Sequence, residues 1–592
     1  MLCNSVVLRG ERVERRFFDV DSSKKIYILI LIGFCVLLYF VNLDRWDLWN
    51  PDEPRYAQVS REMVDRGDWI LMHDNGEVYA DKPPLFFWFI AFSSYLGQGF
   101  SSFSVRFPAA FFGTLTVLLT FLLGKTLYSS RTGLLSGLVL ATNFEFAYLS
   151  TRADIDTTLT FFTTASLFCF FQWYLSRQKE ESGQGSVRRL SMCGFYLGMA
   201  LATLAKGPVG FILPLLVSLI YLIIQKDWQA MKAMKLLPGM LLMLGIVLCW
   251  YLPAVAKGGK DYLQATLLQQ SIGRYSTGFA KVRPFYYYFV NFPGDFLPWF
   301  LFLPGAIVYG FSVRKERLPK EFLFLLIWFI SIFAFFSFSK GKRPLYLLPL
   351  YPSVSLVVGH FWDAHLSDSN GNYVRRTWVS LPVYMMASFV FLVGIGLWFL
   401  LSVANVPIDS SAPRLFQVLM TGARTGGKYL SYVPAGTVFF FVFLLLGSGL
   451  FLGLAHGFKR NSLVFVIIVA TIGISFFYAT RVVFPVINPY KSARFISQEI
   501  VQHRRAGEKL AVYGKVGAAP FNFYTGIVPI LEMDTEEEAV EFFRSTERVL
   551  CLLQYRDFER LSQSAAGISF QMITRRGRGM NEDDDVVLVS NR

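Results

Sequence analysis

The sequence predicts a polytopic α-helical membrane protein that carries a small C-terminal α/β domain. Hydrophobic residues make up 54% of the 592 residues, and charged residues only 17%, with a mean hydropathy of +0.43. Soluble domains carry roughly 25% charged residues, so this composition indicates a chain largely surrounded by lipid. The second observation is a series of about 13 apolar stretches that are long enough to cross a bilayer.

These stretches define a predicted membrane domain over residues 26–487. A transmembrane helix needs about 20 mainly apolar residues. We place the spans at 26–42, 105–125, 132–150, 157–175, 191–206, 207–225, 236–256, 296–313, 321–339, 344–362, 378–402, 432–455 and 462–480.

Basic residues predict the orientation of the spans, because lysine and arginine are enriched in cytoplasmic loops. Six of them precede the first span, so residues 1–25 are predicted to be cytoplasmic. Alternation then makes six later loops cytoplasmic, and each is basic: Lys125 and Arg131; Arg177, Lys179, Arg188 and Arg189; Lys226, Lys232 and Lys235; Arg314, Lys315, Arg317 and Lys320; Arg375 and Arg376; Lys459 and Arg460. The net charge of +15 is therefore a topology signal rather than a nucleic-acid-binding face.

One apolar stretch, Leu85–Leu96, is too short to cross a bilayer unaided. A crossing there would place every later basic loop outside. We therefore predict that 43–104 is one long external loop, with Val59–Val64 and Leu85–Leu96 lying at the membrane interface.

The last part of the chain, 488–592, is mixed in polarity, and the odd number of spans places it outside. Its β-like runs and its one helix indicate an α/β domain. The strands are predicted at Lys509–Tyr513, Val549–Leu553, Phe570–Thr574 and Val586–Val589, and the helix at Thr535–Ser545 with Asp534 as its cap. Because this domain has no motif of its own, we interpret it as a cap or docking surface.

Several function classes lack their signatures in this sequence. There is no Walker loop, dinucleotide fingerprint or Cys-x-x-Cys motif, so no soluble nucleotide cofactor is indicated. Of the six cysteines, only Cys551 falls in the outer compartment, which excludes a disulfide framework there.

Charged residues cluster where spans meet the outer face, although ionisable groups beside hydrocarbon are costly. The acids are Asp52, Glu53, Asp81, Asp154 and Asp156, and the cations are Arg55, Lys82, Lys206, Arg274, Lys342 and Arg343. Their convergence predicts a site for a charged ligand. Cations on the outer face oppose the usual bias, and they indicate a polyanion such as phosphate.

Structural interpretations of the same residues remain open. Asp52 and Glu53 could form a loop ion pair with Arg55, and Asp156 could cap the helix that begins beside it. Basic side chains near a boundary often extend to the interface without binding a ligand. Tyr346 could add a hydrogen bond or a ring face for a sugar, or it could belong to the aromatic belt of the membrane interface.

Seven segments resemble the bacterial aminoarabinose transferase (ArnT-like) and protein O-mannosyltransferase (PMT) families, which are glycosyltransferases of the GT-C type. They cover roughly residues 40–355 in the family's order, and the C-terminal domain also resembles the extracytoplasmic domain of the aminoarabinose branch. The segments are NPDEPRYAQ at 50–58, ADKPPLFFW at 80–88, RADIDTTLTFF at 152–162, LAKGP at 204–208, GRY at 273–275, PFYYY with LPW at 284–299, and SKGKRPLYLLPLYP at 339–352.

The resemblance implies a GT-C-like transferase in a bacterial inner membrane. It would take a sugar from polyprenyl (undecaprenyl) phosphate and pass it, with inversion, to a periplasmic acceptor such as lipid A, a polysaccharide or a protein. Asp52 and Asp156 match the family's acids and are the predicted catalytic residues. The family's phosphate-binding group corresponds to Arg55, Lys82, Arg274 and Tyr346, and Lys342 fits the lysine of its serine-lysine-leucine-proline-like segment.

From the residues themselves we add Lys206 and Arg343 to the phosphate-binding group, and Glu53, Asp81 and Asp154 to the lining of the site. The family's suggested zinc site needs a glutamate and a histidine. This chain has Asp81 at the first place and no histidine between 74 and 359. We therefore expect no zinc. Any metal held by carboxylates such as Asp81 would be a harder ion such as Mg²⁺ or Mn²⁺.

The predicted role of Asp52 depends on the acceptor. A hydroxyl acceptor needs a general base, and Asp52 is the candidate. A phosphate of lipid A is already anionic and needs none. The rival interpretation is a transporter or flippase for a lipid-linked anion, but the internal repeats typical of transporters are not evident in the sequence.

Overall fold

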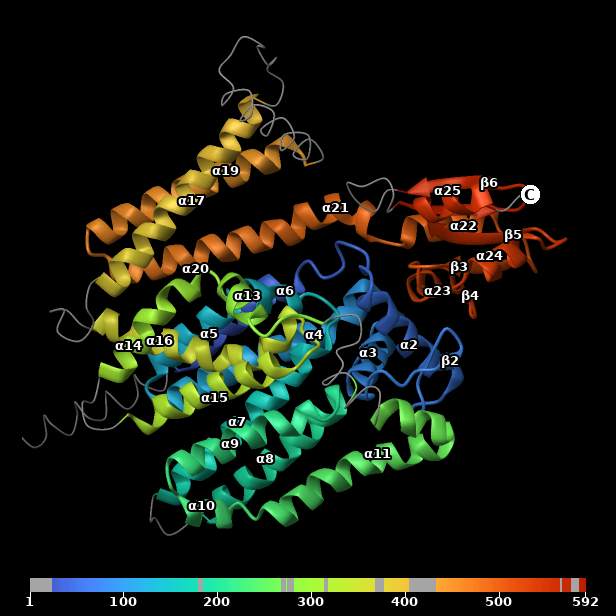
Figure 1. The fold of residues 1–592 in the computed structure, drawn as a ribbon. Coiled ribbons are helices and arrows are strands. Elements are labelled where there is room, and N and C mark those ends of the chain that lie inside the picture. Colours follow the sequence, from blue (N-terminus) through green and yellow to red (C-terminus); the bar gives the residue numbers. More distant parts are fainter. Residues whose placement is uncertain are drawn as a thin grey trace, which may run out of the picture.

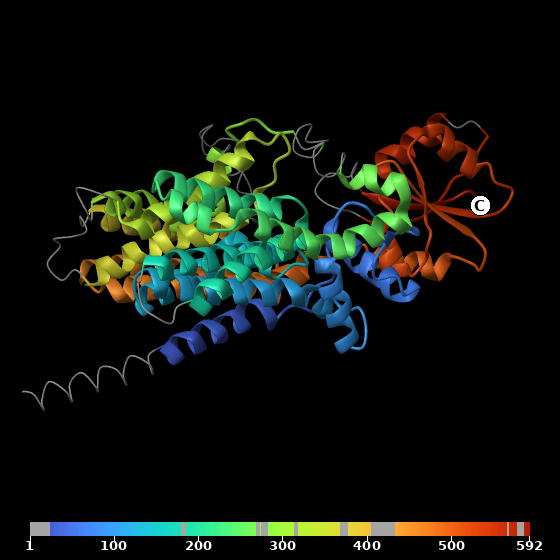
Figure 2. The same cartoon turned by 90° about the horizontal axis from the view of Figure 1, so that it is seen from below.

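A computed structural model describes residues 24–178, 185–267, 273, 282–312, 318–367, 377–403, 433–564, 567–576 and 585–592. Figures 1 and 2 show an elongated bundle of helices with a small α/β unit at one end. The first described helix covers residues 24–40 and ends in the π-helical turn η1 (Val36–Phe40).

The bundle is formed by helices that run along its length or close its ends. They are α2 (Asp52–Arg66), α3 (Leu85–Leu96), α4 (Ser102–Leu127), α5 (Ser130–Ala141), α6 (Phe144–Ser150), α7 (Ile155–Gln178), α8 (Gly185–Lys206), α9 (Val209–Ile224), α10 (Trp228–Ala233), α11 (Leu236–Gln264), α13 (Tyr287–Asp295), η4 (Trp299–Phe302), α14 (Leu303–Ser312), α15 (Lys320–Phe338), η5 (Pro344–Leu350), α16 (Tyr351–Ser367), α17 (Thr377–Val403), α19 (Ala435–Gly457), α20 (Asn461–Tyr478), η6 (Ala479–Val483) and α21 (Phe484–Lys491).

Length and hydropathy identify seven helices in the described residues that could cross a membrane, or eight if one bent pair is a single span. The bent pair joins Tyr287–Asp295 to Trp299–Ser312 at 105°. The seven are Ser102–Leu127, Leu236–Leu267, Lys320–Phe338, Pro344–Ser367, Thr377–Ser402, Ala435–Gly457 and Asn461–Lys491. The prediction of a multi-pass helical membrane protein is confirmed, whereas the number of 13 spans stays a prediction.

Some predicted spans form helices that are shorter or more polar than expected. The stretch 132–150 is divided into α5 and α6, because the Asn143 side chain accepts a hydrogen bond from the Phe146 amide at 2.9 Å and starts a second helix. Helix α7 contains several threonines that are fully buried within the bundle, and their hydroxyl groups lower its hydropathy. Helix α9 has only 16 residues.

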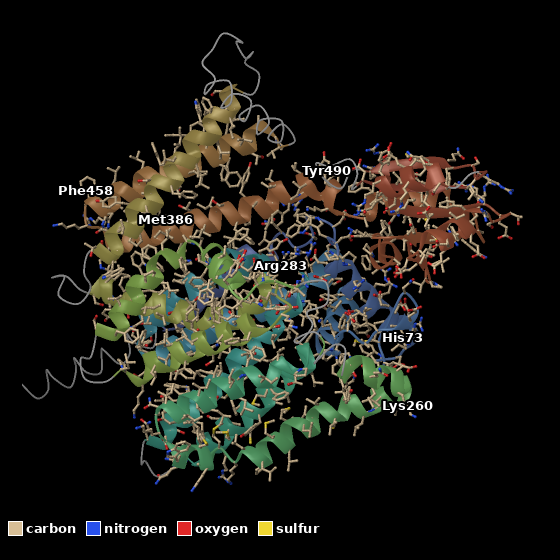
Figure 3. All side chains as sticks on the ribbon, in the orientation of Figure 1. His73, Lys260, Arg283, Met386, Phe458 and Tyr490 are labelled. Atoms are coloured by element: carbon tan, nitrogen blue, oxygen red, sulfur yellow. The ribbon has the colours of Figure 1, made fainter. Side chains whose placement is uncertain are left out.

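The segment between the first helix and α4 folds as two helices and a hairpin. Strands β1 (His73–Asp74) and β2 (Glu77–Val78) pair antiparallel, and α2 packs on α3 through Tyr56, whose ring lies 5.9 Å and 5.5 Å from the rings of Phe86 and Phe87. Val59–Val64 is the middle of α2, and the apolar stretch Leu85–Leu96 is α3. Figure 3 shows His73 at the same end of the molecule as the α/β unit.

The C-terminal unit contains a five-stranded mixed sheet in the order β4-β3-β5-β7-β6. Strands β4, β3 and β5 are parallel, and β7 is antiparallel to β5 and β6. The elements are α22 (Arg494–His503), β3 (Lys509–Tyr513), α23 (Ala519–Thr525), β4 (Leu531–Met533), α24 (Glu536–Phe543), β5 (Val549–Gln554), α25 (Tyr555–Ser564), β6 (Gln571–Arg576) and β7 (Val586–Ser590). The predicted α/β character is confirmed.

One detail of this unit differs from the prediction. Helix α24 is capped by Thr535 and not by Asp534, because the Thr535 hydroxyl accepts from the Glu538 amide while the Thr535 amide donates to the Glu538 carboxylate. The apolar helical run Asn461–Lys491 passes the predicted domain boundary at 487 without a break. The boundary between 26–487 and 488–592 therefore stays a prediction.

Candidate active site

Asp52 and Arg343 meet at the end of the bundle that carries the α/β unit. Asp52 begins α2, and Arg343 immediately precedes η5. Arg343 Nη2 donates to Asp52 Oδ2 at 2.8 Å, and both side chains remain partly exposed, at 29% and 24%. An acid and a cation that were predicted to share a site are thus in direct contact.

A second acid–cation pair is formed by Asp156 and Lys206. Asp156 lies in the first turn of α7, and Lys206 is the last residue of α8 and donates to its carboxylate. The Lys206 ammonium also lies 4.5 Å from the centre of the Tyr346 ring, within the range of a cation–π contact. Three of the predicted site residues therefore converge from α7, α8 and η5.

Asp154, and not Asp156, caps helix α7. Asp154 Oδ1 accepts a hydrogen bond from the Asp156 amide at 2.8 Å, which satisfies one of the free N–H groups at the helix start. Burial raises the pKa of Asp154 to about 7, and the neighbouring charge of Asp156 acts in the same direction. The predicted capping role thus belongs to Asp154 and not to Asp156, and the Asp156 carboxylate accepts from Lys206 instead.

Glu53 is buried and paired with a cation inside the protein, and its predicted place in the lining of the site stays a prediction. Its side chain is 0% exposed, as is that of Arg106, whose Nε and Nη2 donate to it at 2.7 Å and 2.9 Å. The amides of Trp49 and Ala153 also donate to Glu53, at 2.8 Å and 2.9 Å. Burial alone would raise the pKa of Glu53, but the charges of Arg106 and Arg152 outweigh it and lower the pKa.

This arrangement ties together the two segments that carry the candidate acids. Glu53 directly follows Asp52, and its carboxylate accepts from the amide of Ala153, which directly precedes Asp154. The Glu53 carboxylate therefore joins the backbone beside Asp52 to the backbone beside Asp154. Arg106, which is not among the residues predicted from the sequence, also donates to the carbonyls of Leu43, Trp46 and Asp47 at 2.8, 2.8 and 2.6 Å. The available signal was a charged residue at the start of the predicted span 105–125, where an unpaired charge would be costly.

Arg55 pairs with Asp74 of the hairpin rather than with Asp52 or Glu53. Its Nε lies 3.3 Å from Asp74 Oδ2. Burial raises the pKa of Asp74 to about 7 against the opposing charge of Arg55, and the charges of nearby acids, including Asp81, act in the same direction as burial. The place of Asp81 in the site stays a prediction.

Lys342 binds the protein's own backbone. Its ammonium is buried and donates to the carbonyls of Arg283 (3.1 Å) and Ser339. This placement favours a structural role for Lys342 over the predicted phosphate contact.

The remaining predicted residues are placed less completely. Lys82 is half-buried just before α3, and Arg274 lies outside the described residues. Among the described residues, no group of three or more His, Cys, Asp or Glu side chains is arranged to hold a metal. The predictions about zinc and about harder ions therefore stay predictions.

Comparison with known proteins identifies relatives of this chain. A family profile described as dolichyl-phosphate-mannose-protein mannosyltransferase (PMT) matches residues 24–260. The chain is 34% identical over 346 residues to undecaprenyl phosphate-alpha-4-amino-4-deoxy-L-arabinose arabinosyl transferase 2 of Proteus mirabilis, covering 58% of this chain and 60% of that protein. The corresponding transferase of Edwardsiella ictaluri is 31% identical over 416 residues, or 70% of each chain.

Several of these matches are partial, since the chain spans 60% and 62% of the Proteus mirabilis and Pseudomonas aeruginosa relatives. The fold matches more completely. The crystal structure of ArnT from Cupriavidus metallidurans bound to undecaprenyl phosphate superposes with a TM-score of 0.74 at 20% identity, covering 96% of this chain and 98% of that one. On the sequence match that covers 70% of a relative, this multi-pass membrane protein belongs to the ArnT-like branch of the PMT family.

Proposed function

We propose that the protein is a membrane glycosyltransferase that moves a sugar from an undecaprenyl phosphate donor to an acceptor at the outer face of the membrane. The observation that carries this proposal is the pair of acid–cation contacts, Asp52 with Arg343 and Asp156 with Lys206, at one end of the bundle. The relatives named as undecaprenyl phosphate-dependent arabinosyl transferases support the choice of donor.

The donor phosphate would bind to Arg343, Lys206 and Arg55, with Tyr346 beside Lys206 and with Lys82 and Arg274 as further candidates. Arginine suits this role because its planar group can donate two parallel hydrogen bonds to a phosphate. A phosphate arriving at Arg343 competes with the carboxylate of Asp52, which already accepts from that guanidinium. Binding of the donor would therefore release Asp52 from its cation.

This exchange would prepare the chemical step. The bond between the sugar's anomeric carbon and the phosphate oxygen breaks, and its electron pair stays on the phosphate. An acceptor hydroxyl attacks from the opposite face, which inverts the carbon, and its proton passes to Asp52. A carboxylate that has lost its arginine partner is a stronger base, and a placed base contributes about 10²–10⁴-fold.

Arg343 and Lys206 would stabilise the negative charge that grows on the leaving phosphate. The Asp156 carboxylate orients the Lys206 ammonium for that purpose. If the acceptor is itself a phosphate, as on lipid A, the nucleophile is already anionic and Asp52 positions it without taking a proton.

The proposal includes a topology. Thirteen spans over 26–487 would place residues 1–25 in the cytoplasm, and the loop 43–104 and the unit 488–592 in the periplasm of a bacterial inner membrane. Two observations support this topology. Basic residues lie in each of the six loops that alternation predicts to be cytoplasmic, and the α/β unit contacts α2 and the segment before it, beside the candidate acids.

A purified-protein assay tests the function. The protein in nanodiscs would be supplied with undecaprenyl phosphate-linked sugars, among them 4-amino-4-deoxy-L-arabinose, and with lipid A or a hydroxyl acceptor. We expect release of undecaprenyl phosphate together with a glycosylated acceptor. Movement of the intact donor lipid between leaflets without transfer would overturn the proposal in favour of a flippase.

A further inference from the structure

The C-terminal α/β unit contacts the polypeptide on both sides of Asp52. On the N-terminal side, the Tyr524 hydroxyl bonds to both backbone groups of Leu48. It accepts from the Leu48 amide at 2.8 Å and donates to the Leu48 carbonyl at 3.2 Å. Leu48 itself is buried, so this one hydroxyl satisfies two polar groups that water cannot reach.

On the C-terminal side of Asp52, the contact is made by Arg61 of helix α2. Its Nη1 donates to the Phe523 carbonyl at 2.8 Å, and its guanidinium lies over the Phe523 ring at 4.2 Å. Phe523 also belongs to the apolar cluster of the external loop, which includes Leu48 and Tyr56. Adjacent residues of α23 thus hold both ends of the segment that presents Asp52.

A third contact fixes the hairpin that carries Asp74. Asn75 occupies the turn between β1 and β2 with a φ of 55°. Its Nδ2 donates to the Ile530 carbonyl at 2.8 Å, and its Oδ1 accepts from the Ile530 amide at 2.7 Å and from Asn522 at 2.9 Å. The partner of Arg55 is therefore also held by the α/β unit.

We propose that the C-terminal unit is a positioning component of the active site, with Tyr524 and Arg61 as the positioning residues that place Asp52. This proposal rests on the proposed function, because it assigns Asp52 a role in transfer. The bound geometry of reacting groups must be held closely, and displacement by about 1 Å can cost about 10²-fold in rate. Helix α2 begins at Asp52, so a shift of the preceding residues moves this carboxylate directly.

The test compares two tyrosines of the same unit. Tyr524→Phe removes the hydroxyl that bonds to Leu48, whereas Tyr513→Phe removes a hydroxyl that accepts from Arg560 within the α/β unit at 3.1 Å. We expect Tyr524→Phe to lower kcat by about 10-fold while the Kd for undecaprenyl phosphate stays unchanged. Tyr513→Phe should leave both unchanged. Equal kcat values for the two variants would overturn the proposal.

Two further measurements separate positioning from general damage. In the Asp52→Asn background, Tyr524→Phe should cause no additional loss of kcat. The carboxylate that Tyr524 positions is already absent there, so displacing the side chain at position 52 has no further effect on kcat. A second, multiplicative loss would show that Tyr524 acts independently of Asp52. Arg61→Lys should resemble Tyr524→Phe, because lysine cannot reproduce the planar stacked contact.

Hydrogen–deuterium exchange tests the placement without any transfer assay. Amides of residues 47–56 should exchange faster in Tyr524→Phe than in the wild type, and should not change in Tyr513→Phe. Unchanged exchange in Tyr524→Phe would contradict the positioning role. If the wild type transfers no sugar, the proposed function fails, while these exchange data still decide whether the unit holds the segment around Asp52.

Discussion

Asp52 accepts a hydrogen bond at 2.8 Å from Arg343, which lies 291 residues away in the chain. Asp52 begins α2 and Arg343 directly precedes η5, so this contact joins two segments that are far apart in the sequence. The candidate base and a candidate phosphate ligand are therefore coupled, and substitutions at either position affect both donor binding and turnover.

Asp52→Asn removes the negative charge but keeps the size of the side chain. We expect turnover with a hydroxyl acceptor to fall by about 10²-fold or more, because the base is lost. Binding of undecaprenyl phosphate should be at least as tight as in the wild type, because Arg343 no longer has a competing carboxylate. Turnover and donor binding are measured on the same nanodisc preparation. Near-normal turnover would indicate an anionic acceptor, and weaker binding would recast Asp52 as a donor ligand.

Arg343 and Lys342 are adjacent cations for which the structure predicts opposite behaviour. Arg343→Met should weaken undecaprenyl phosphate binding by about 10- to 100-fold, as expected for the loss of charge-assisted hydrogen bonds. Lys342→Met should leave donor binding intact and lower the unfolding temperature, because two carbonyls lose their donor. Lipid-binding titrations and thermal unfolding distinguish the two variants. The assignment fails if Lys342→Met is the variant that loses donor binding.

Arg106→Gln leaves the buried carboxylate of Glu53 without its main cation. Breaking a buried ion pair from one side typically costs about 3–5 kcal/mol, so the variant should be strongly destabilised. The control is Arg494→Gln, which removes an exposed partner of Asp47 and should cost about 0–1 kcal/mol. Thermal unfolding in detergent compares the two. Equal stability of the variants would contradict the central role of Glu53 and Arg106.

Asp74 predicts a pH dependence of stability. The folded protein raises the pKa of Asp74 to about 7, above the usual value of 3.8. Between those values the folded state holds a proton that the unfolded state has released, so this group's contribution to the free energy of unfolding falls as pH rises from about 4 to 7. The free energy of unfolding of Asp74→Asn, relative to that of the wild type, should therefore be higher at pH 8 than at pH 5. Asp65→Asn, at an exposed position of α2, should show no such difference, and a parallel shift in both variants would contradict the prediction.

The proposed topology is tested with reporter fusions. Fusions after Gly99 and after Asn591 should both report the periplasm, because the loop and the α/β unit are proposed to lie on the same side. A cytoplasmic signal after Gly99 would mean that Leu85–Leu96 crosses the membrane, and the candidate acids would no longer share a face with the proposed donor site.

The site residues that could be predicted are charged residues that lie next to apolar spans, where a charge is costly. Asp52, Asp156, Lys206 and Arg343 are ionisable groups beside apolar spans, and the structure brings them into two pairs. Residues whose role depends on a partner far along the chain could not be assigned. Glu53 has the same local pattern as Asp52, yet it faces Arg106 inside the protein. The capping roles of Asp154 and Thr535 depend on where each helix starts, to within one residue, and sequence patterns do not resolve this.

The sequence by itself determined the membrane class, the helical bundle, the α/β character of the C-terminal unit and the end of the spans where the charges gather. Hydrophobic run length and charge distribution are local properties of the chain, and they are sufficient for those conclusions. Only the tertiary structure decided which acid pairs with which cation, that Glu53 joins the two acid-bearing segments, and that Tyr524 reaches Leu48 across 476 residues. Such contacts form only when segments far apart in the sequence meet in the folded protein, and the local sequence of one segment contains no information about its partner.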